Sequence, residues 1–196
     1  MKPAFPTLTG SGSSFDRMSR FPGDESTLLI EVPEADPLVG RFRHEHDPVA
    51  RLGIPAHITV LYPFIRPDAI GPEICQQLTR LLLGFEPFRF HLTHLNRFSP
   101  TTLWLAPSPS EPFSELTVAV LRQFPGLYPY GDPDLKPIPH VTIADRLDET
   151  RLDAIDRDFA RTSAYLLPVE SIVKRVTLMT RSSGRWESRI SFGLGT

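Results

Sequence analysis

Two short stretches decide the fold of this chain: Ala56-His57-Ile58-Thr59-Val60-Leu61 and His140-Val141-Thr142-Ile143-Ala144. Each alternates polar and apolar residues and closely follows a proline, Pro55 or Pro139, which is typical of a strand with one buried face. Residues i and i+2 of a strand point to the same face of the sheet. Each stretch therefore predicts a strand that carries one imidazole and one hydroxyl on one face and aliphatic side chains on the other.

The same order of elements surrounds each stretch. Around the first we expect strands over 28–32, 56–62 and 88–98, a helical or loop segment over 36–52 and a helix over 68–83. Around the second we expect strands over 102–105, 140–144, 171–180 and 186–192, with helices over 111–124 and 149–164. This duplication predicts an α+β domain over 28–196 with pseudo-twofold lobes, 28–98 and 103–182. The bilobal fold would have two antiparallel sheets, flanked by helices, around a central cleft.

Composition limits the classes of protein to which the chain can belong. Of its 196 residues, 40% are hydrophobic and 22% are charged, which is enough apolar material for a buried core. The net charge of −2 excludes a strongly basic protein that binds nucleic acid along its phosphates. The one cysteine, Cys75, excludes an intrachain disulfide and a cysteine-based zinc cluster. No apolar run approaches the roughly 18 residues of a membrane span, and we expect a cytoplasmic monomer.

Residues 1–27 differ in composition from the rest of the chain. They are rich in Gly, Ser and Pro and contain few aliphatic residues. No apolar segment typical of a secretory signal follows the first lysine. We therefore predict a flexible N-terminal tail.

The two strands bring together side chains that suit phosphodiester chemistry. In facing lobes, His57, Thr59, His140 and Thr142 would share one cleft. Two imidazoles with ordinary pKa values of about 6.5 can act as general base and general acid near neutral pH. Two hydroxyls can donate hydrogen bonds to phosphate oxygens as charge develops in the transition state. We therefore predict that these four residues form a catalytic site that requires neither a metal nor a cofactor.

Three further residues are predicted to contact the substrate. Tyr130 lies in the Pro- and Gly-rich loop before His140, where its ring could stack on a base. Lys136, in the same loop, could attract a phosphate. Phe64 directly follows the first strand, although an aromatic residue there is more often part of a core.

Two other histidine patterns compete with this interpretation. His91-Leu92-Thr93 repeats the tripeptide, but it has no preceding proline and no counterpart in the second lobe. His44 and His46 could bind a metal if they lay on a strand, which would indicate a metal hydrolase. The glutamate that a cupin-like site needs does not follow, so a solvated polar turn is the simpler interpretation.

The stretches Pro55–Phe64 and Pro137–Ala144, with Val176-Thr177-Leu178 and the following Trp186, resemble the 2H phosphoesterase superfamily. The similarity is to its 2′-5′ RNA ligase and cyclic phosphodiesterase branch and covers residues 28–194. It implies a bilobal α+β fold with a central cleft. It also implies metal-independent hydrolysis or ligation of phosphodiesters, such as 2′,3′-cyclic nucleotides, RNA ends, ADP-ribose cyclic phosphate or 2′-5′ linked oligonucleotides.

The resemblance also implies roles for individual residues. His140 would be the base that activates water, His57 the acid for the leaving oxygen, and the two threonines would hold the phosphate. Some relatives carry an arginine directly after the second strand, whereas here Asp145 precedes Arg146. This departure favours a small nucleotide over a long RNA. A 2′-5′ RNA ligase, and a module that binds a nucleotide or RNA end without turnover, remain alternatives.

Overall fold

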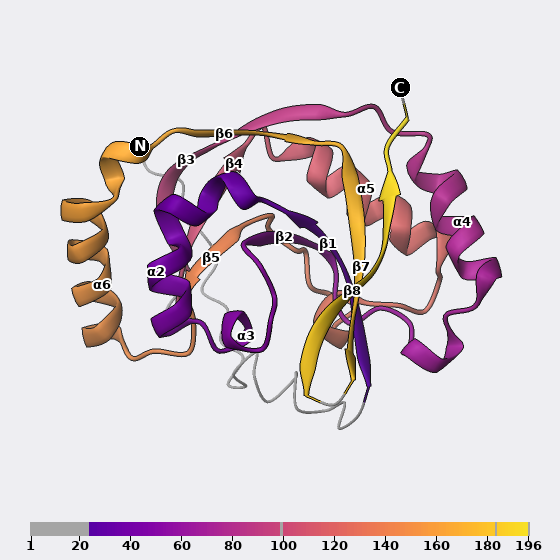
Figure 1. Cartoon of the computed structure of the whole chain (residues 1–196), viewed down its shortest axis with the longest axis horizontal. Coiled ribbons are helices and arrows are strands. Elements are labelled where there is room, and N and C mark those ends of the chain that lie inside the picture. Colours follow the sequence, from indigo (N-terminus) through magenta and orange to yellow (C-terminus); the bar gives the residue numbers. More distant parts are fainter. Residues whose placement is uncertain (1–23, 99, 183, 196) are drawn as a thin grey trace.

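The computed structural model describes residues 24–98, 100–182 and 184–195 (Figure 1). Its helices are α2 (Asp36–His46), α3 (Pro48–Arg51), α4 (Pro72–Leu82), α5 (Glu111–Gln123) and α6 (Glu149–Thr162). Its strands are β1 (Glu25–Glu31), β2 (His57–Leu61), β3 (Phe88–Phe98), β4 (Thr102–Ser108), β5 (Val141–Ala144), β6 (Val169–Val173), β7 (Arg175–Ser182) and β8 (Arg185–Gly193). The expected helices are confirmed, because apolar residues that recur every three to four positions encode them locally.

The strands of the described chain form one sheet, in the order β6-β3-β4-β5-β2-β1-β7-β8. All of its neighbouring strands run antiparallel. The two strands predicted to carry the chemistry, β2 and β5, are central neighbours that pair through Ile58 and Val141. The expectation of two separate sheets is therefore wrong, because this pairing joins them. The expected combination of antiparallel strands and helices is confirmed.

The strands do not divide along the sheet in their order along the chain. We call β2, β1, β7 and β8 the first half of the sheet, and β5, β4, β3 and β6 the second half. β3 belongs to the second half because it pairs with β4 and β6, although it lies in the expected lobe 28–98. β7 belongs to the first half because it pairs with β1, although it lies in the expected lobe 103–182. Long-range pairing, rather than chain order, sets the neighbours in this sheet.

Three expected strand boundaries also change. The single strand expected over 171–180 is two strands that separate at Lys174, with β6 beside β3 and β7 beside β1. β1 begins at Glu25 rather than at residue 28, because its first three residues pair with β7. β4 extends to Ser108 rather than ending at residue 105, and Pro107 lies within it, opposite Leu92. Of the expected tail, residues 1–23 lie outside the described residues.

The four longer helices cover one face of the sheet in two groups. α2 lies against β5 and beside α6, where Phe42 and Phe159 have ring centroids 5.7 Å apart. α5 lies against β2 and beside α4. Figure 1 shows these two groups at opposite ends of the molecule. α2 thus follows β1 of the first half but contacts β5 of the second half. α5 follows β4 of the second half but contacts β2 of the first half. No helix in the described part of the chain is both long and apolar enough to span a membrane.

The central strands have one face in the core and one face away from it. Ile58, Val60, Val141 and Ile143 are at most 3% exposed and pack among the residues of the helices. The alternating positions 57, 59, 140 and 142 are half-buried on the other side. We call the side that carries His57, Thr59, His140 and Thr142 the motif face. The period-two alternation that the sequence predicts is confirmed here.

Phe113 tests the packing of α5. Its ring lies edge-on to Phe88 and Phe90, with centroids 5.0 Å away in each case. Phe113→Ala is expected to lower the free energy of unfolding by about 3–5 kcal/mol, because it removes a buried aromatic side chain. Val118→Ala, at an exposed position of the same helix, is expected to change it by less than about 0.5 kcal/mol. Urea unfolding measures both changes, and equal effects would contradict the packing described here.

Candidate active site

The pairing of β2 with β5 brings the four predicted catalytic side chains to one place. Ile58 lies opposite Val141 in an antiparallel pair. By that register His57 faces Thr142 across the junction, and Thr59 faces His140. The register thus places each histidine opposite the threonine of the other stretch. This arrangement can present two imidazoles and two hydroxyls to a single phosphate.

The two imidazoles are held in the same way. The Nδ1 atom of His57 lies 2.8 Å from the carbonyl oxygen of Pro55, and that of His140 lies 2.7 Å from the carbonyl oxygen of Ile138. A carbonyl oxygen can only accept a hydrogen bond, so each Nδ1 carries the hydrogen. In the neutral ring this leaves the lone pair on Nε2. Both Nε2 atoms are therefore the ones that remain for proton transfer.

The surroundings of the two imidazoles differ in charge. Burial and, next, the Arg43 guanidinium lower the pKa of His57 to about 3, against the hydrogen bond to Pro55. Burial also lowers the pKa of His140, but the Asp145 carboxylate opposes that shift. Both rings are therefore neutral at pH 7 in the free protein. Because a cation lies near one ring and an anion near the other, a proton is more easily placed on His140 than on His57.

Arg43 is a residue of this site that the sequence interpretation missed. It lies on α2 and is only 3% exposed. Its guanidinium donates to the carbonyl oxygens of Thr142 (3.0 Å), Ile54 (3.1 Å) and Pro55 (3.0 Å), and it lies 2.8 Å from a carboxylate oxygen of Asp47. It thus contacts the backbone of both motif strands or of the residues directly before them.

Tyr130 lies beside the motif residues, but not as a free stacking surface. Its hydroxyl hydrogen-bonds with Thr59, and its ring packs against Tyr62 with centroids 6.0 Å apart. Its backbone N–H donates to the carbonyl oxygen of Tyr62 at 2.6 Å, and its φ of 53° lies in the left-handed region, which is strained for a residue other than glycine. The fold thus holds this tyrosine against Thr59, where it can orient the threonine hydroxyl.

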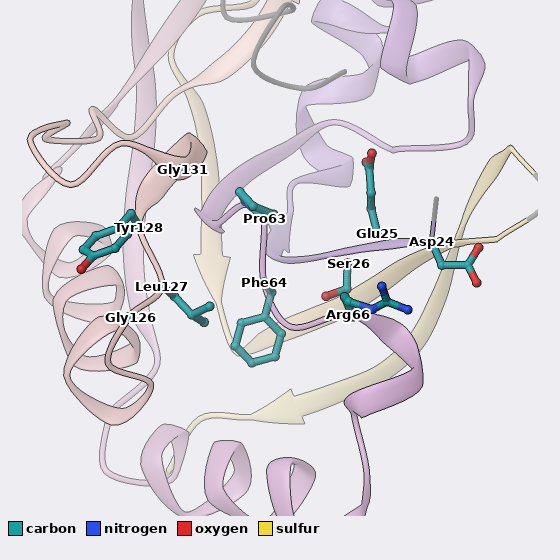
Figure 2. Close-up of a pocket in the computed structure, with 10 residues that line it drawn as sticks. All are labelled: Asp24, Glu25, Ser26, Pro63, Phe64, Arg66, Gly126, Leu127, Tyr128 and Gly131. Carbon is teal, nitrogen blue, oxygen red and sulfur yellow. The ribbon is translucent and has the colours of Figure 1, made fainter. Parts of the chain in front are cut away.

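The other two predicted substrate contacts, Lys136 and Phe64, differ in their exposure to solvent. Lys136 is exposed in the loop before His140. Phe64 is 5% exposed and packs edge-on against Phe124 in the main core. One side of Phe64 lines a pocket of ≈310 Å³, together with Tyr128 and Arg66 (Figure 2). None of the four motif residues lines that pocket.

Two aromatic rings lie directly against His140. Phe98 and Trp104 stack on each other with centroids 4.6 Å apart and planes at 25°. The His140 ring meets Phe98 at 5.0 Å and Trp104 at 5.7 Å, both edge-on. Neither ring is among the site residues that the sequence predicts. Trp104 on β4 pairs with Thr142 on β5. The two rings therefore form the apolar boundary of the site toward the second half of the sheet.

Arg146 turns back toward the site instead of extending beyond it. Its φ of 64° is again left-handed. Its Nε lies 3.4 Å from a carboxylate oxygen of Asp145, and its charge also interacts with Asp47 and Tyr62. Arg146 stands one residue later than the arginine expected from the family resemblance, and the backbone changes direction at this residue.

Comparison with known proteins identifies the family. A family model described as the 2′-5′ RNA ligase superfamily matches residues 30–185. The chain belongs to this superfamily. The resemblance predicted from the two H-x-T stretches is confirmed. Membership in the 2′-5′ RNA ligase superfamily supports a phosphoesterase or ligase-type activity.

Solved structures show the same fold. LigT of E. coli complexed with 3′-AMP shares 16% identity, with a TM-score of 0.54 and coverage of 88% of this chain and 99% of that chain. LigT complexed with NADP+ shares 17% identity, with a TM-score of 0.51 and coverage of 89% and 99%. TT0787 of Thermus thermophilus shares 16% identity, with a TM-score of 0.55 and coverage of 86% and 97%. A search of curated proteins finds no match.

The competing histidine patterns lie elsewhere. His44 and His46 lie on α2 rather than on a strand, and residues two apart on a helix do not face the same ligand. The strand on which the metal-hydrolase alternative depends is therefore not formed. Among the described residues, no group of three or more His, Cys, Asp or Glu is arranged to hold a metal. His91 lies on β3, opposite Ser108 and Glu170, and not at the β2–β5 junction.

The low pKa of His57 predicts how stability depends on pH. Between pH 6.5 and pH 3 the unfolded chain binds a proton at this imidazole and the folded chain does not, so this group makes the stability fall as the pH is lowered from about 6.5 toward 3. His57 accounts for up to about 2 kcal/mol of this fall at pH 5. Urea unfolding at pH 7 and pH 5 is expected to show a smaller fall for His57→Gln than for the wild type. His91→Gln should keep the full fall, and an unchanged fall in His57→Gln would contradict the assignment.

Proposed function

We propose that this protein is a metal-independent phosphoesterase that hydrolyses a cyclic phosphodiester. The substrate class is a 2′,3′-cyclic nucleotide, an RNA end with a cyclic phosphate, or an ADP-ribose cyclic phosphate. The observation that carries the proposal is the junction of β2 and β5, where two H-x-T tripeptides from distant parts of the chain meet across one backbone pair. The four motif residues supply a general base, a general acid and two hydrogen-bond donors.

The reaction needs one proton removed and one proton delivered. The base takes a proton from water as the water oxygen attacks phosphorus. The bond from phosphorus to one ring oxygen breaks, and the acid gives a proton to that oxygen, so the product is a phosphomonoester beside a free hydroxyl. The Thr59 and Thr142 hydroxyls donate to the non-bridging oxygens as charge develops on them. Tyr130 orients the Thr59 hydroxyl by the hydrogen bond between them.

The charges around the two rings support a specific division of labour. His57 stays neutral near Arg43, so the lone pair on its Nε2 is free to accept a proton. His140 lies near Asp145 and suits the acid, because a bound anionic phosphate adds to the effect of that carboxylate. The proposal therefore assigns the base to His57 and the acid to His140, which reverses the division that the family resemblance implies.

A small nucleotide fits these surroundings better than a long RNA. The chain has a net charge of −2, whereas binding along an RNA backbone depends on many cationic contacts. The aromatic rings of Phe98 and Trp104 form the edge of the site at His140. Such rings can stack on a nucleotide base or exclude water from the site. LigT, which shares this fold, was solved with 3′-AMP and with NADP+. We extend nucleotide binding of that kind to this protein as part of the proposal.

Hydrolysis of a substrate panel in EDTA tests the proposal. The panel contains the 2′,3′-cyclic nucleotides and an ADP-ribose cyclic phosphate, assayed from pH 5 to pH 8. His57→Ala and His140→Ala are each expected to lower turnover about 10²- to 10⁴-fold, because each removes a proton-transfer group. His91→Ala is the matched control, since it removes the histidine of the third H-x-T tripeptide on β3, and it should leave turnover unchanged.

Several results would contradict the proposal. Turnover that EDTA abolishes, or that survives in both histidine variants, would be incompatible with a metal-independent histidine pair. Binding of nucleotides by the folded wild type without turnover would indicate a binding module. Ring opening by the 5′-hydroxyl of a second RNA end in place of water, which joins the two ends through a 2′-5′ linkage, would indicate a ligase.

A substrate with a good leaving group separates the base from the acid. A p-nitrophenyl phosphodiester expels an anion that needs no protonation, so the acid becomes dispensable. His140→Ala is expected to recover most of its lost activity on this ester relative to the cyclic substrate, and His57→Ala is not. Recovery by His57→Ala alone would restore the division of roles that the resemblance implies.

A further inference from the structure

The junction between the two motif strands contains little backbone pairing. In the described chain, β2 and β5 pair only at Ile58 and Val141. By contrast, all four residues 28–31 of β1 pair with residues of β2. The strands that carry the two imidazoles are thus joined by a single pair of residues. Something else must fix their separation if the histidines are to act on one phosphate, because an error of about 1 Å in such a site can cost about 10²-fold in rate.

The Arg43 guanidinium occupies the position where it can do this. Nη1 donates to the carbonyl oxygen of Thr142, two residues after His140. Nη2 donates to the carbonyl oxygens of Ile54 and Pro55, just before His57. The guanidinium is planar and rigid, so these three acceptors are held at fixed positions relative to one another.

Arg43 also shares an acceptor with His57. The carbonyl oxygen of Pro55 accepts from Arg43 Nη2 at 3.0 Å and lies 2.8 Å from His57 Nδ1. A displacement of Arg43 would therefore move the group that sets the orientation and tautomer of the His57 ring. Asp47, which is 1% exposed, holds Arg43 in place across one helical turn and caps α3 by accepting from the N–H of Val49.

We propose that Arg43, held by Asp47, is the positioning residue of this site, which fixes the separation of the two histidine-bearing strands and orients His57. This inference rests on the proposed function for its catalytic consequence, but not for its structural one. Arg43 contacts no substrate in this role. It acts through the backbone at Thr142 and Pro55.

The groups that face His57 support the role. Arg43 from α2 and His140 before β5 are the charged or titratable groups that act on its ring, and both oppose protonation. Glu31 is its ladder partner on β1, but that carboxylate accepts a hydrogen bond from Thr177 at 2.9 Å. Arg43 is therefore the charged group that acts most strongly on the ring, so it has an electrostatic effect on His57 in addition to its geometric one.

Two substitutions separate the geometric effect from the electrostatic one. Arg43→Lys keeps the positive charge but loses the planar fork that reaches both strands. Arg43→Met removes both the charge and the fork. Arg41 provides the matched control: it lies one position from Phe42 on the same helix, but it is exposed and binds Asp158 on α6. Arg41→Lys and Arg41→Met therefore make the same chemical changes away from the junction.

The first measurement is the titration of the histidine side chains by NMR in the absence of any substrate. Arg43→Met is expected to raise the pKa of His57 toward its ordinary value, whereas Arg43→Lys and both Arg41 variants should leave it low. Because this readout needs no turnover, it stays valid if the proposed hydrolysis is wrong. If Arg43→Met does not fold, Arg43→Lys still tests the geometric effect through a changed chemical shift of the His57 ring at unchanged pKa.

The second measurement is steady-state hydrolysis of the cyclic nucleotide that the wild type turns over best. Arg43→Lys is expected to lower kcat about 10²-fold, because the distance between the two histidines is no longer fixed. KM should change little, because the threonines that hold the phosphate remain. Arg41→Lys should match the wild type. The inference is overturned if folded Arg43→Lys keeps wild-type kcat and wild-type His57 shifts. Failure of the wild type to hydrolyse any substrate would count against the proposed function alone.

Discussion

A single backbone pair, Ile58 with Val141, sets the register on which the candidate site depends. The four polar side chains of the two H-x-T stretches become neighbours only because these residues lie opposite each other. Alternation along each strand then places the histidines and threonines on one face and the aliphatic residues in the core. A slip of one residue in either strand would exchange the two faces, burying an imidazole and exposing Val141 or Ile58. The packing of both residues, each fully buried, therefore fixes the chemistry as well as the sheet.

Local patterns in the sequence predict most of the elements but not how the strands associate. The helices and the two motif strands follow from periodicity within a few residues, and the structure confirms them. The assignment of β3 and β7 to halves of the sheet depends on partners far along the chain, which no local pattern encodes. The same limit explains the strand expected over 171–180. Its residues are uniformly strand-like, but those on either side of Lys174 pair with opposite halves of the sheet.

The motif residues could be predicted, whereas the residue that supports them was missed. Arg43 stands in a polar run with two histidines, which resembles a solvated surface. One signal was available: Val39 belongs to the core face of α2, and position 43 lies one turn further along that face. An arginine on the apolar face of a helix, with an aspartate four residues later, indicates a buried ion pair. Such a pair costs desolvation energy and is weak evidence for stability, so its presence here is better explained by what it positions.

The two halves of the site are built alike, and the proposed division between acid and base rests on the difference in charge between them. Both imidazoles are fixed through Nδ1 by a carbonyl oxygen two residues earlier, so geometry alone would give them equal proton affinities. The helices break this equality. α2 places the Arg43 cation near His57. α5 contacts β2 through a neutral residue instead, because the Thr117 hydroxyl donates to the carbonyl oxygen of Val60 at 2.9 Å. Asp145 adds the opposite charge near His140. Two equivalent imidazoles would compete for one proton. Two unequal imidazoles can divide the work, with His140 holding the proton that goes to the leaving oxygen and His57 accepting the proton of the attacking water.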